Sequence, residues 1–125
     1  MLKEGLVFSQ EKIVQENETA AVLGSGGVDV FSTPMLIAFM ENTAYKLVQE
    51  HLEKGDSTVG TVVNIEHLKA NLVGDKLKCQ ATLKKIEGKK LEFEVLVSFG
   101  EEIVGKGSHT RYIVNLEKFL GKLKR

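Results

Sequence analysis

The sequence of 125 residues has one cysteine, one proline and no tryptophan, and its 17 basic residues balance 17 acidic residues. The single thiol, Cys79, cannot form a disulfide within the chain, so nothing marks a secreted, disulfide-stabilised protein. The absence of a basic excess argues against a broad surface for nucleic acid. No apolar run approaches the roughly 20 residues of a membrane span, and the first residues lack the order of a signal peptide. We therefore expect a soluble, cytoplasmic protein with no nucleic-acid or membrane partner.

What the chain does have suits one compact domain over residues 1–125. Apolar residues make up 42% of it and charged residues 27%, which excludes a disordered or fibrous chain. A chain of this length can build one hydrophobic core but not two.

The first third of the sequence predicts a helix that follows a flexible segment. Two short extended segments are expected at Leu6–Val14 and Glu18–Leu23, before the glycine-rich run GSGG at residues 24–27. Thr33 then precedes Pro34, which predicts a helix start with the Thr33 side chain as N-cap and Pro34 at the first helical position.

The predicted helix continues without glycine or proline from Pro34 to Gly55, about five turns. Residues Met35–Met40 are apolar on every side, so we expect that part to be buried all round. The second half is amphipathic and can present polar side chains such as Lys46 and Glu50 to solvent.

After Gly55 the hydrophobic period changes to two, which is typical of strands. The alternation predicts that His67 shares the core-facing side of its strand with Val59, Thr61, Val63 and Ile65, if that strand has no bulge. Further strands are expected at Lys76–Ile86, Leu91–Phe99 and Ile103–Val114, with a short helix at Leu116–Leu123 capped by Asn115. The first of these segments is predicted to carry Leu77, Cys79, Ala81 and Leu83 on one face. The inward face of the second is predicted to be Leu91, Phe93, Val95, Val97 and Phe99.

One long helix followed by an antiparallel meander indicates an α+β domain rather than a βαβ repeat. A helix that is apolar all round its first turns needs contacts on several sides. A strongly curved antiparallel β-sheet wrapped around a long central helix would supply them.

Three polar residues stand out against this apolar background. Glu41 directly follows the apolar turns of the helix, where a buried carboxylate is costly unless it is paired, although it can also mark the emergence of the helix into solvent. His67 is either an ordinary core histidine or an imidazole that faces the helix bearing Glu41, which would make an acid–base pair. Thr33 is explained as a cap, yet a hydroxyl at a helix N-terminus also lies where an oxyanion is favoured.

Other motifs are weaker. The glycine-rich segment at residues 24–27 lacks the preceding strand and following helix of a dinucleotide-binding loop, and no Gly-x-Ser-x-Gly motif is present. His51, His109 and Cys79 have no spacing typical of metal ligands. We expect neither a metal nor a cofactor.

Five segments of the sequence resemble the hot-dog-fold thioesterases, and within them the fluoroacetyl-CoA thioesterase-like group. These segments are FSTPMLIAFME at residues 31–41, STVGT at 57–61, IEHL at 65–68, GKGSHTR at 105–111 and VNLEKFL at 114–120. The resemblance implies the hot-dog fold, a homodimer or dimer of dimers, and hydrolysis of an acyl-CoA thioester.

By the same resemblance, Thr33, Glu41 and His67 fall on the catalytic positions of the group. Gly60 falls where the backbone lies close to the substrate acyl group, and Arg111 falls where the family has a basic residue near the site. Phe31 is the aromatic residue nearest to the segment that forms a lid in the fluoroacetyl-specialised enzyme. We expect Gly60, Phe31 and Arg111 to contact substrate.

The sequence departs from that enzyme at residues 24–27, where glycines stand in place of the aromatic lid. The expected substrate is therefore a different or broader short acyl-CoA. The competing hypothesis is a non-catalytic module that binds acyl-CoA, because one fold hosts many functions.

Overall fold

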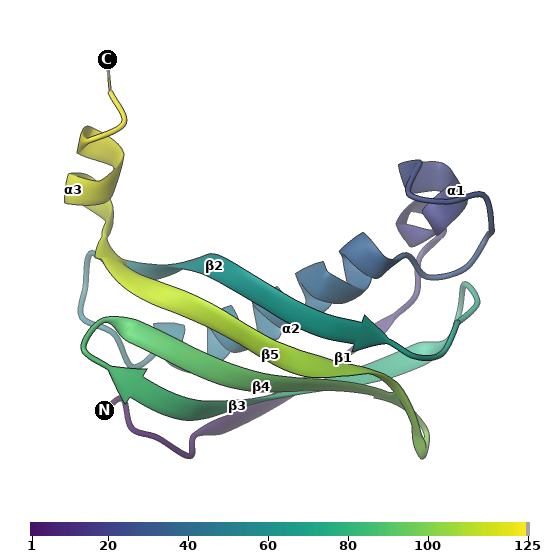
Figure 1. Cartoon of the computed structure of the whole chain (residues 1–125), viewed down its shortest axis with the longest axis horizontal. Coiled ribbons are helices and arrows are strands. Elements are labelled where there is room, and N and C mark those ends of the chain that lie inside the picture. Colours follow the sequence, from purple (N-terminus) through teal and green to yellow (C-terminus); the bar gives the residue numbers. More distant parts are fainter. Residues whose placement is uncertain (125) are drawn as a thin grey trace.

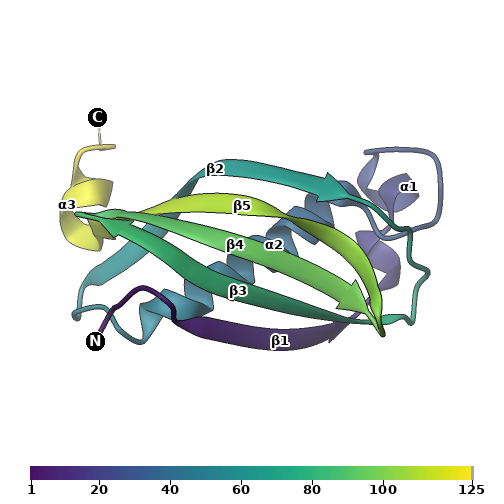
Figure 2. The same ribbon diagram turned by 60° about the horizontal axis from the view of Figure 1, so that its bottom comes forward.

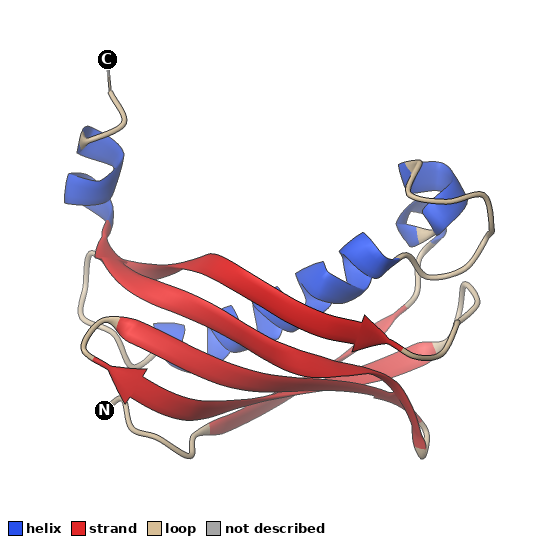
Figure 3. Ribbon diagram, in the orientation of Figure 1, coloured by secondary structure: helices blue, strands red, loops and turns tan. Residues whose placement is uncertain are grey.

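The computed structural model describes residues 1–124 and contains one five-stranded antiparallel sheet with the strand order β1-β3-β4-β5-β2 (Figures 1 and 3). The strands are β1 (Val7–Ile13), β2 (Asp56–His67), β3 (Lys76–Glu87), β4 (Lys90–Phe99) and β5 (Glu102–Asn115). β1 and β2 therefore form the two edges.

One long helix, α2 (Thr33–Gln49), crosses one face of this sheet, and Figure 2 shows the opposite face without a helix over it. The shorter helices are η1 (Glu16–Glu18), α1 (Ala20–Leu23) and α3 (Leu116–Gly121). Among the described residues, no helix combines the length and apolarity that crossing a bilayer requires. The predicted arrangement of a long helix wrapped by a curved antiparallel sheet is confirmed.

Most of the core lies between α2 and the strands β3 and β4. Strand alternation fixes it as predicted, because every second residue of β3 and β4 points toward the helix. The buried strand residues are Leu77, Cys79, Ala81, Leu83, Leu91, Phe93, Val95 and Val97. The prediction for Phe99 is wrong: it is the last residue of β4 and is 38% exposed.

The expectation that Met35–Met40 is buried all round is also wrong in part. Leu36, Phe39 and Met40 are buried, whereas Ala38 is exposed and Ile37 is half-buried. The sheet covers only one side of the helix, so the opposite side of these turns is not enclosed by the chain itself.

The segment Glu18–Leu23 was expected to be extended and is instead helical. The Thr19 side chain accepts a hydrogen bond from the backbone N–H of Val22 and caps the single turn of α1. Gly24 ends that turn with φ +82°, a conformation in which glycine has no steric penalty. Local capping therefore outweighs the β propensity of these residues.

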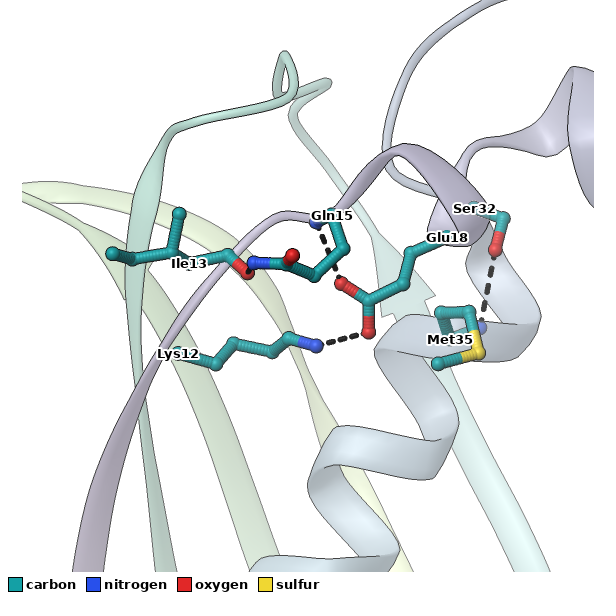
Figure 4. A network of polar contacts seen from close by, with 6 residues as sticks. All are labelled: Lys12, Ile13, Gln15, Glu18, Ser32 and Met35. Carbon is teal, nitrogen blue, oxygen red and sulfur yellow. Dashed lines mark hydrogen bonds and ion pairs between the residues drawn. The ribbon is translucent and has the colours of Figure 1, made fainter.

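The helix α2 begins one residue earlier than predicted. Its N-cap is Ser32, whose Oγ accepts a hydrogen bond from the backbone N–H of Met35 at 3.3 Å (Figure 4). Thr33 and Pro34 are the first two helical residues, and proline is well tolerated there because its missing N–H would have no helical partner. The Thr33 hydroxyl is therefore not needed to cap the helix.

A partly buried ion pair holds the region ahead of α2 against β1 (Figure 4). Lys12 on β1 pairs with Glu18, which is 5% exposed and also accepts a hydrogen bond from the backbone N–H of Gln15 at 2.8 Å. The Lys12 ammonium lies 5.7 Å from the ring centre of Phe31 and 5.9 Å from that of Phe39, within the range of cation–π attraction. These contacts fix where α2 starts.

Candidate functional site

Strand β2 carries a bulge that decides which of its side chains face the helix. Its pairing with β5 shifts between Gly60 and Val62, so Thr61 is the extra residue. The prediction that Val59 and Thr61 share the face of His67 is therefore wrong, since the bulge brings Gly60 to that face instead. The helix-facing pairs are Gly60–Arg111, Val63–His109, Ile65–Gly107 and His67–Gly105.

His67 faces the helix as predicted and contacts its first turn. Its Nδ1 lies 2.8 Å from the Thr33 hydroxyl oxygen, in hydrogen-bond contact. Its Nε2 is buried and has no hydrogen-bond partner among residues 1–124. The imidazole is therefore oriented on one side and has one ring nitrogen free for another group.

Glu41 lies two turns further along α2 and is half-buried. Its carboxylate approaches the backbone of Gly60 so closely that a Cβ at that position would lie 2.9 Å from Oε2. The same Cβ would lie 3.1 Å from Cε1 of His109 and 3.3 Å from Nη1 of Arg111. Glycine at position 60 thus leaves the room in which these three side chains meet.

Arg111 is the fixed cation of this group. Its guanidinium donates from Nε to the Thr58 hydroxyl at 2.8 Å and from Nη2 to the Thr58 carbonyl at 3.0 Å. Nη1 lies 3.1 Å from Nε2 of His109. Burial lowers the pKa of Arg111, and the negative charge of Glu41 opposes this effect. Contacts with Thr58 and His109 therefore fix the position of the guanidinium.

Sequence reasoning set His109 aside, yet it is 1% exposed and belongs to this group. The alternation of residues along β5 does indicate that His109 is buried. Gly105, Gly107, His109 and Arg111 share the inward face, and each alternates with a residue that points outward. A histidine and an arginine on the inward face of a strand already indicate a buried polar group.

The six residues expected in the site therefore form two groups within one chain. Thr33 contacts His67, and both lie near a hollow of about 170 Å³ that His67 and the buried Phe31 help to line. Glu41 lies with Gly60 and Arg111. Glu41 lies eight positions after Thr33 along α2, a rise of roughly 12 Å.

The roles of two neighbouring hydroxyls can be distinguished by mutation, because Ser32 caps the helix and Thr33 contacts His67. Ser32→Ala is expected to lower the free energy of unfolding by about 1 kcal/mol, the usual cost of losing an N-cap. Thr33→Val should leave stability nearly unchanged, since Thr33 is exposed at the first helical position. Urea denaturation of both variants checks this, and the reverse order of stabilities would contradict the assignment of Ser32 as the cap.

Burial lowers the pKa of His67 below its usual 6.5, and the nearby polar backbone of Lys69 opposes this effect. The folded protein then binds fewer protons at His67 than the unfolded chain once the pH falls below 6.5. We expect the free energy of unfolding to decrease as pH falls from about 7 to about 5, with a shallower decrease in His67→Gln. An NMR titration of His67 measures the shift directly, and a midpoint at or above 6.5 would contradict it.

The described part of the chain contains no group of three or more His, Cys, Asp or Glu side chains placed to hold a metal ion. Cys79 is buried in the core, where burial raises the pKa of its thiol to about 11. The groups available for chemistry are therefore the hydroxyl, imidazole, carboxylate and guanidinium described above.

Comparisons with known proteins identify a family for this chain. The family model described as "Fluoroacetyl-CoA-specific thioesterase" matches residues 14–117. The fluoroacetyl-CoA thioesterase of Streptantibioticus cattleyicolor is 30% identical over 97 residues, which are 78% of this chain and 70% of that protein.

Solved structures show the same fold. The crystal structure of a mutant fluoroacetyl-CoA-specific thioesterase in complex with fluoroacetate and CoA superimposes with a TM-score of 0.89 at 27% identity, covering 94% of this chain and 99% of that one. A thioesterase superfamily member from Thermus thermophilus has a TM-score of 0.90 at 24% identity, covering 98% of this chain and 91% of that one, and so bears on the fold alone. The fold is the hot-dog fold of the thioesterases. The chain belongs to the family of fluoroacetyl-CoA-specific thioesterases.

Proposed function

We propose that the protein is an acyl-CoA thioesterase that hydrolyses a short acyl-CoA to the free acid and CoA with Thr33, Glu41 and His67. Membership of a thioesterase family supports the reaction, and the similar crystal structure was solved with CoA and a short carboxylate. The observation that carries the assignment of the site is the Glu41 carboxylate, half-buried against Gly60 and facing the fixed Arg111.

Glu41 has two possible routes to the same products. As a general base it takes a proton from water while the water oxygen bonds to the thioester carbonyl carbon. As a nucleophile it forms an acyl-carboxylate anhydride that water then cleaves. On either route the carbon–sulfur bond breaks and the CoA sulfur takes up a proton. Single turnover in labelled water separates the routes, because label enters the Glu41 side chain only on the covalent one.

The other residues act around this carboxylate. His67 binds and orients reacting groups through its free ring nitrogen and transfers protons, and Thr33 holds the ring through Nδ1. Backbone N–H groups at the start of α2 and beside Gly60 stabilise the charge that develops on the carbonyl oxygen. These steps need only water and groups of the protein.

The proposed substrates are short acyl-CoA esters, without strict selectivity for fluoroacetyl-CoA. Phe31 is buried beside His67 and forms the apolar backing of the hollow at this end of the site. Residues Gly24, Ser25, Gly26 and Gly27 are all exposed and offer no aromatic cover. Without such a cover, selectivity for one small acyl group is expected to be weak.

A second copy of the chain completes the site. β2 is an edge strand, and an edge can pair with the same edge of another copy about a twofold axis. An antiparallel pairing that sets His67 of one copy opposite Gly60 of the other brings Thr33 and His67 of the first toward Glu41 of the second. The exposed Val62 and Val63 on β2, 52% and 38% accessible, would be covered in the same contact.

This arrangement accounts for the separation of the two groups along α2. It makes the homodimer the smallest active unit, alone or within a dimer of dimers. Sedimentation equilibrium is expected to give at least twice the 13.8 kDa of one chain, and a monomer at the concentrations of the activity assay would contradict it. We also propose that the enzyme is cytoplasmic, in keeping with its single free thiol.

The proposed reaction is tested by thiol release from a panel of acyl-CoA esters that includes acetyl, fluoroacetyl, propionyl and longer chains. Turnover of the short members, lost in Glu41→Ala and His67→Ala, is the expected result. If no ester is hydrolysed and acyl-CoA only raises the melting temperature, the protein is a binding module instead. Hydrolysis that survives both substitutions would mean that these residues are structural.

A further inference from the structure

His109 lies at the centre of the Glu41 group although none of the proposed steps uses it. It belongs to β5, pairs across the sheet with Val63, and is 1% exposed. Its ring stacks against Phe93 of β4 with the ring centres 6.1 Å apart and the planes inclined by 29°. A histidine so enclosed cannot bind substrate directly, so its role lies in the groups that it touches.

The contacts of the two ring nitrogens fix the protonation state. Nδ1 lies 2.7 Å from the carbonyl oxygen of Val62, which can only accept, so Nδ1 carries the hydrogen. Nε2 lies 3.1 Å from Nη1 of Arg111, which can only donate, so Nε2 must be the acceptor. The imidazole is therefore neutral, with its single N–H on Nδ1.

Each of these contacts reaches one part of the site. Val62 directly follows the bulged residue of β2, so the Nδ1–H bond holds the backbone on one side of the bulge that presents Gly60 to Glu41. Nε2 supplies the third anchor of the Arg111 guanidinium, after the two that Thr58 provides. One ring thus connects the backbone that faces Glu41 to the cation that faces Glu41.

Burial and the Arg111 charge favour this neutral state. Burial lowers the pKa of His109 and the Arg111 charge lowers it further, whereas the Val62 carbonyl and the Glu41 charge act in the opposite direction. A second proton would also point an N–H group at the N–H of Arg111. The neutral ring is the form that satisfies both neighbours.

We propose that His109 is a positioning residue, a neutral Nδ1–H imidazole that joins the β2 bulge to Arg111 and so fixes Gly60 and the guanidinium against Glu41. The inference rests on the proposed function, in which Glu41 is the reacting carboxylate. His109 acts through Val62 and Arg111 and touches no reacting atom.

Three substitutions separate the two contacts. His109→Phe keeps an aromatic ring beside Phe93 and removes both hydrogen bonds. His109→Asn places an amide N–H near the position of Nδ1 and keeps a donor for Val62, whereas His109→Gln places an amide oxygen near Nε2 and keeps an acceptor for Arg111. Ser108→Ala, on the exposed opposite face of the same strand, is the matched control.

We expect His109→Phe to lower kcat by at least about tenfold, the scale of losing a hydrogen bond to a charged group, with a smaller change in KM. The Asn and Gln variants should each recover part of the loss, and Ser108→Ala should behave as wild type. In the wild type, two-dimensional proton–nitrogen NMR of the imidazole should show the hydrogen on Nδ1.

A folded His109→Phe variant with wild-type kcat would overturn the inference, and so would a hydrogen on Nε2. Should the Phe variant fail to fold, the Asn variant and the NMR spectrum decide. If only the role of His109 is wrong, the wild-type protein still hydrolyses acyl-CoA and still depends on Glu41. If the wild-type protein hydrolyses no acyl-CoA, both the proposed function and the positioning role are wrong.

Discussion

Glu41→Gln is expected to lower kcat for acyl-CoA hydrolysis by about a thousandfold or more, while the protein keeps its fold. The amide has nearly the shape of the carboxylate but can neither take a proton from water nor attack a carbonyl carbon. General-base catalysis alone contributes roughly a hundredfold to ten-thousandfold, and the loss of a nucleophile costs at least as much.

The fold should tolerate the substitution because no hydrogen bond or ion pair within residues 1–124 depends on the Glu41 side chain. The expected change is confined to kcat, since the reacting carboxylate does not hold the CoA portion of the substrate. Glu50→Gln is the matched control, because Glu50 is an exposed carboxylate directly after the same helix. A Glu41→Gln variant with more than a tenth of wild-type kcat would exclude the carboxylate from the chemistry.

Gly107→Ala is expected to give the largest loss of stability, about 3 kcal/mol of the free energy of unfolding, as is usual for overpacking against fixed neighbours. A Cβ at this position would lie 2.6 Å from the Cα of Ile65 and would also collide with the carbonyl oxygen of Asn64. Both obstacles are backbone of the paired strand β2, which cannot move aside as a flexible side chain can. β2 would have to separate from β5, and Gly60 and His67 would move with it.

The control for this substitution is Gly27→Ala, where an added Cβ meets no atom within 4 Å. It should leave stability unchanged within about 0.5 kcal/mol. Chemical denaturation of the two variants measures the difference. Equal stability of Gly107→Ala and wild type would show that β2 and β5 do not approach each other as closely as described.

Much of the fold could be predicted from the sequence because its determinants are local and periodic. Alternation along β3 and β4 placed the core residues, and the run from Pro34 to Gly55 without glycine or proline predicted α2. The helix-facing side of His67 was also predicted, since Val63, Ile65 and His67 all follow the bulge and keep their common parity.

Features decided by contacts between distant segments could not be predicted. The bulge at Thr61 is set by pairing with β5, and the neighbouring Gly60 is only a weak local sign of it. Ser32 and Thr33 can both cap a helix, and the hydrogen bonds of the folded chain show which hydroxyl caps α2 and which contacts His67. Metal-ligand spacing does not single out His109, because spacing does not show which face of a strand a histidine occupies.

The central claim is that Glu41 of one copy works with Thr33 and His67 of another, and a heterodimer tests it most directly. One copy carries Glu41→Gln and the other His67→Ala, each with a different affinity tag, and tandem purification isolates the mixed dimer. One of its two composite sites is then intact, so about half of the wild-type dimer's rate is expected although both parent variants are inactive. A purified heterodimer as inactive as its parents would contradict the shared site.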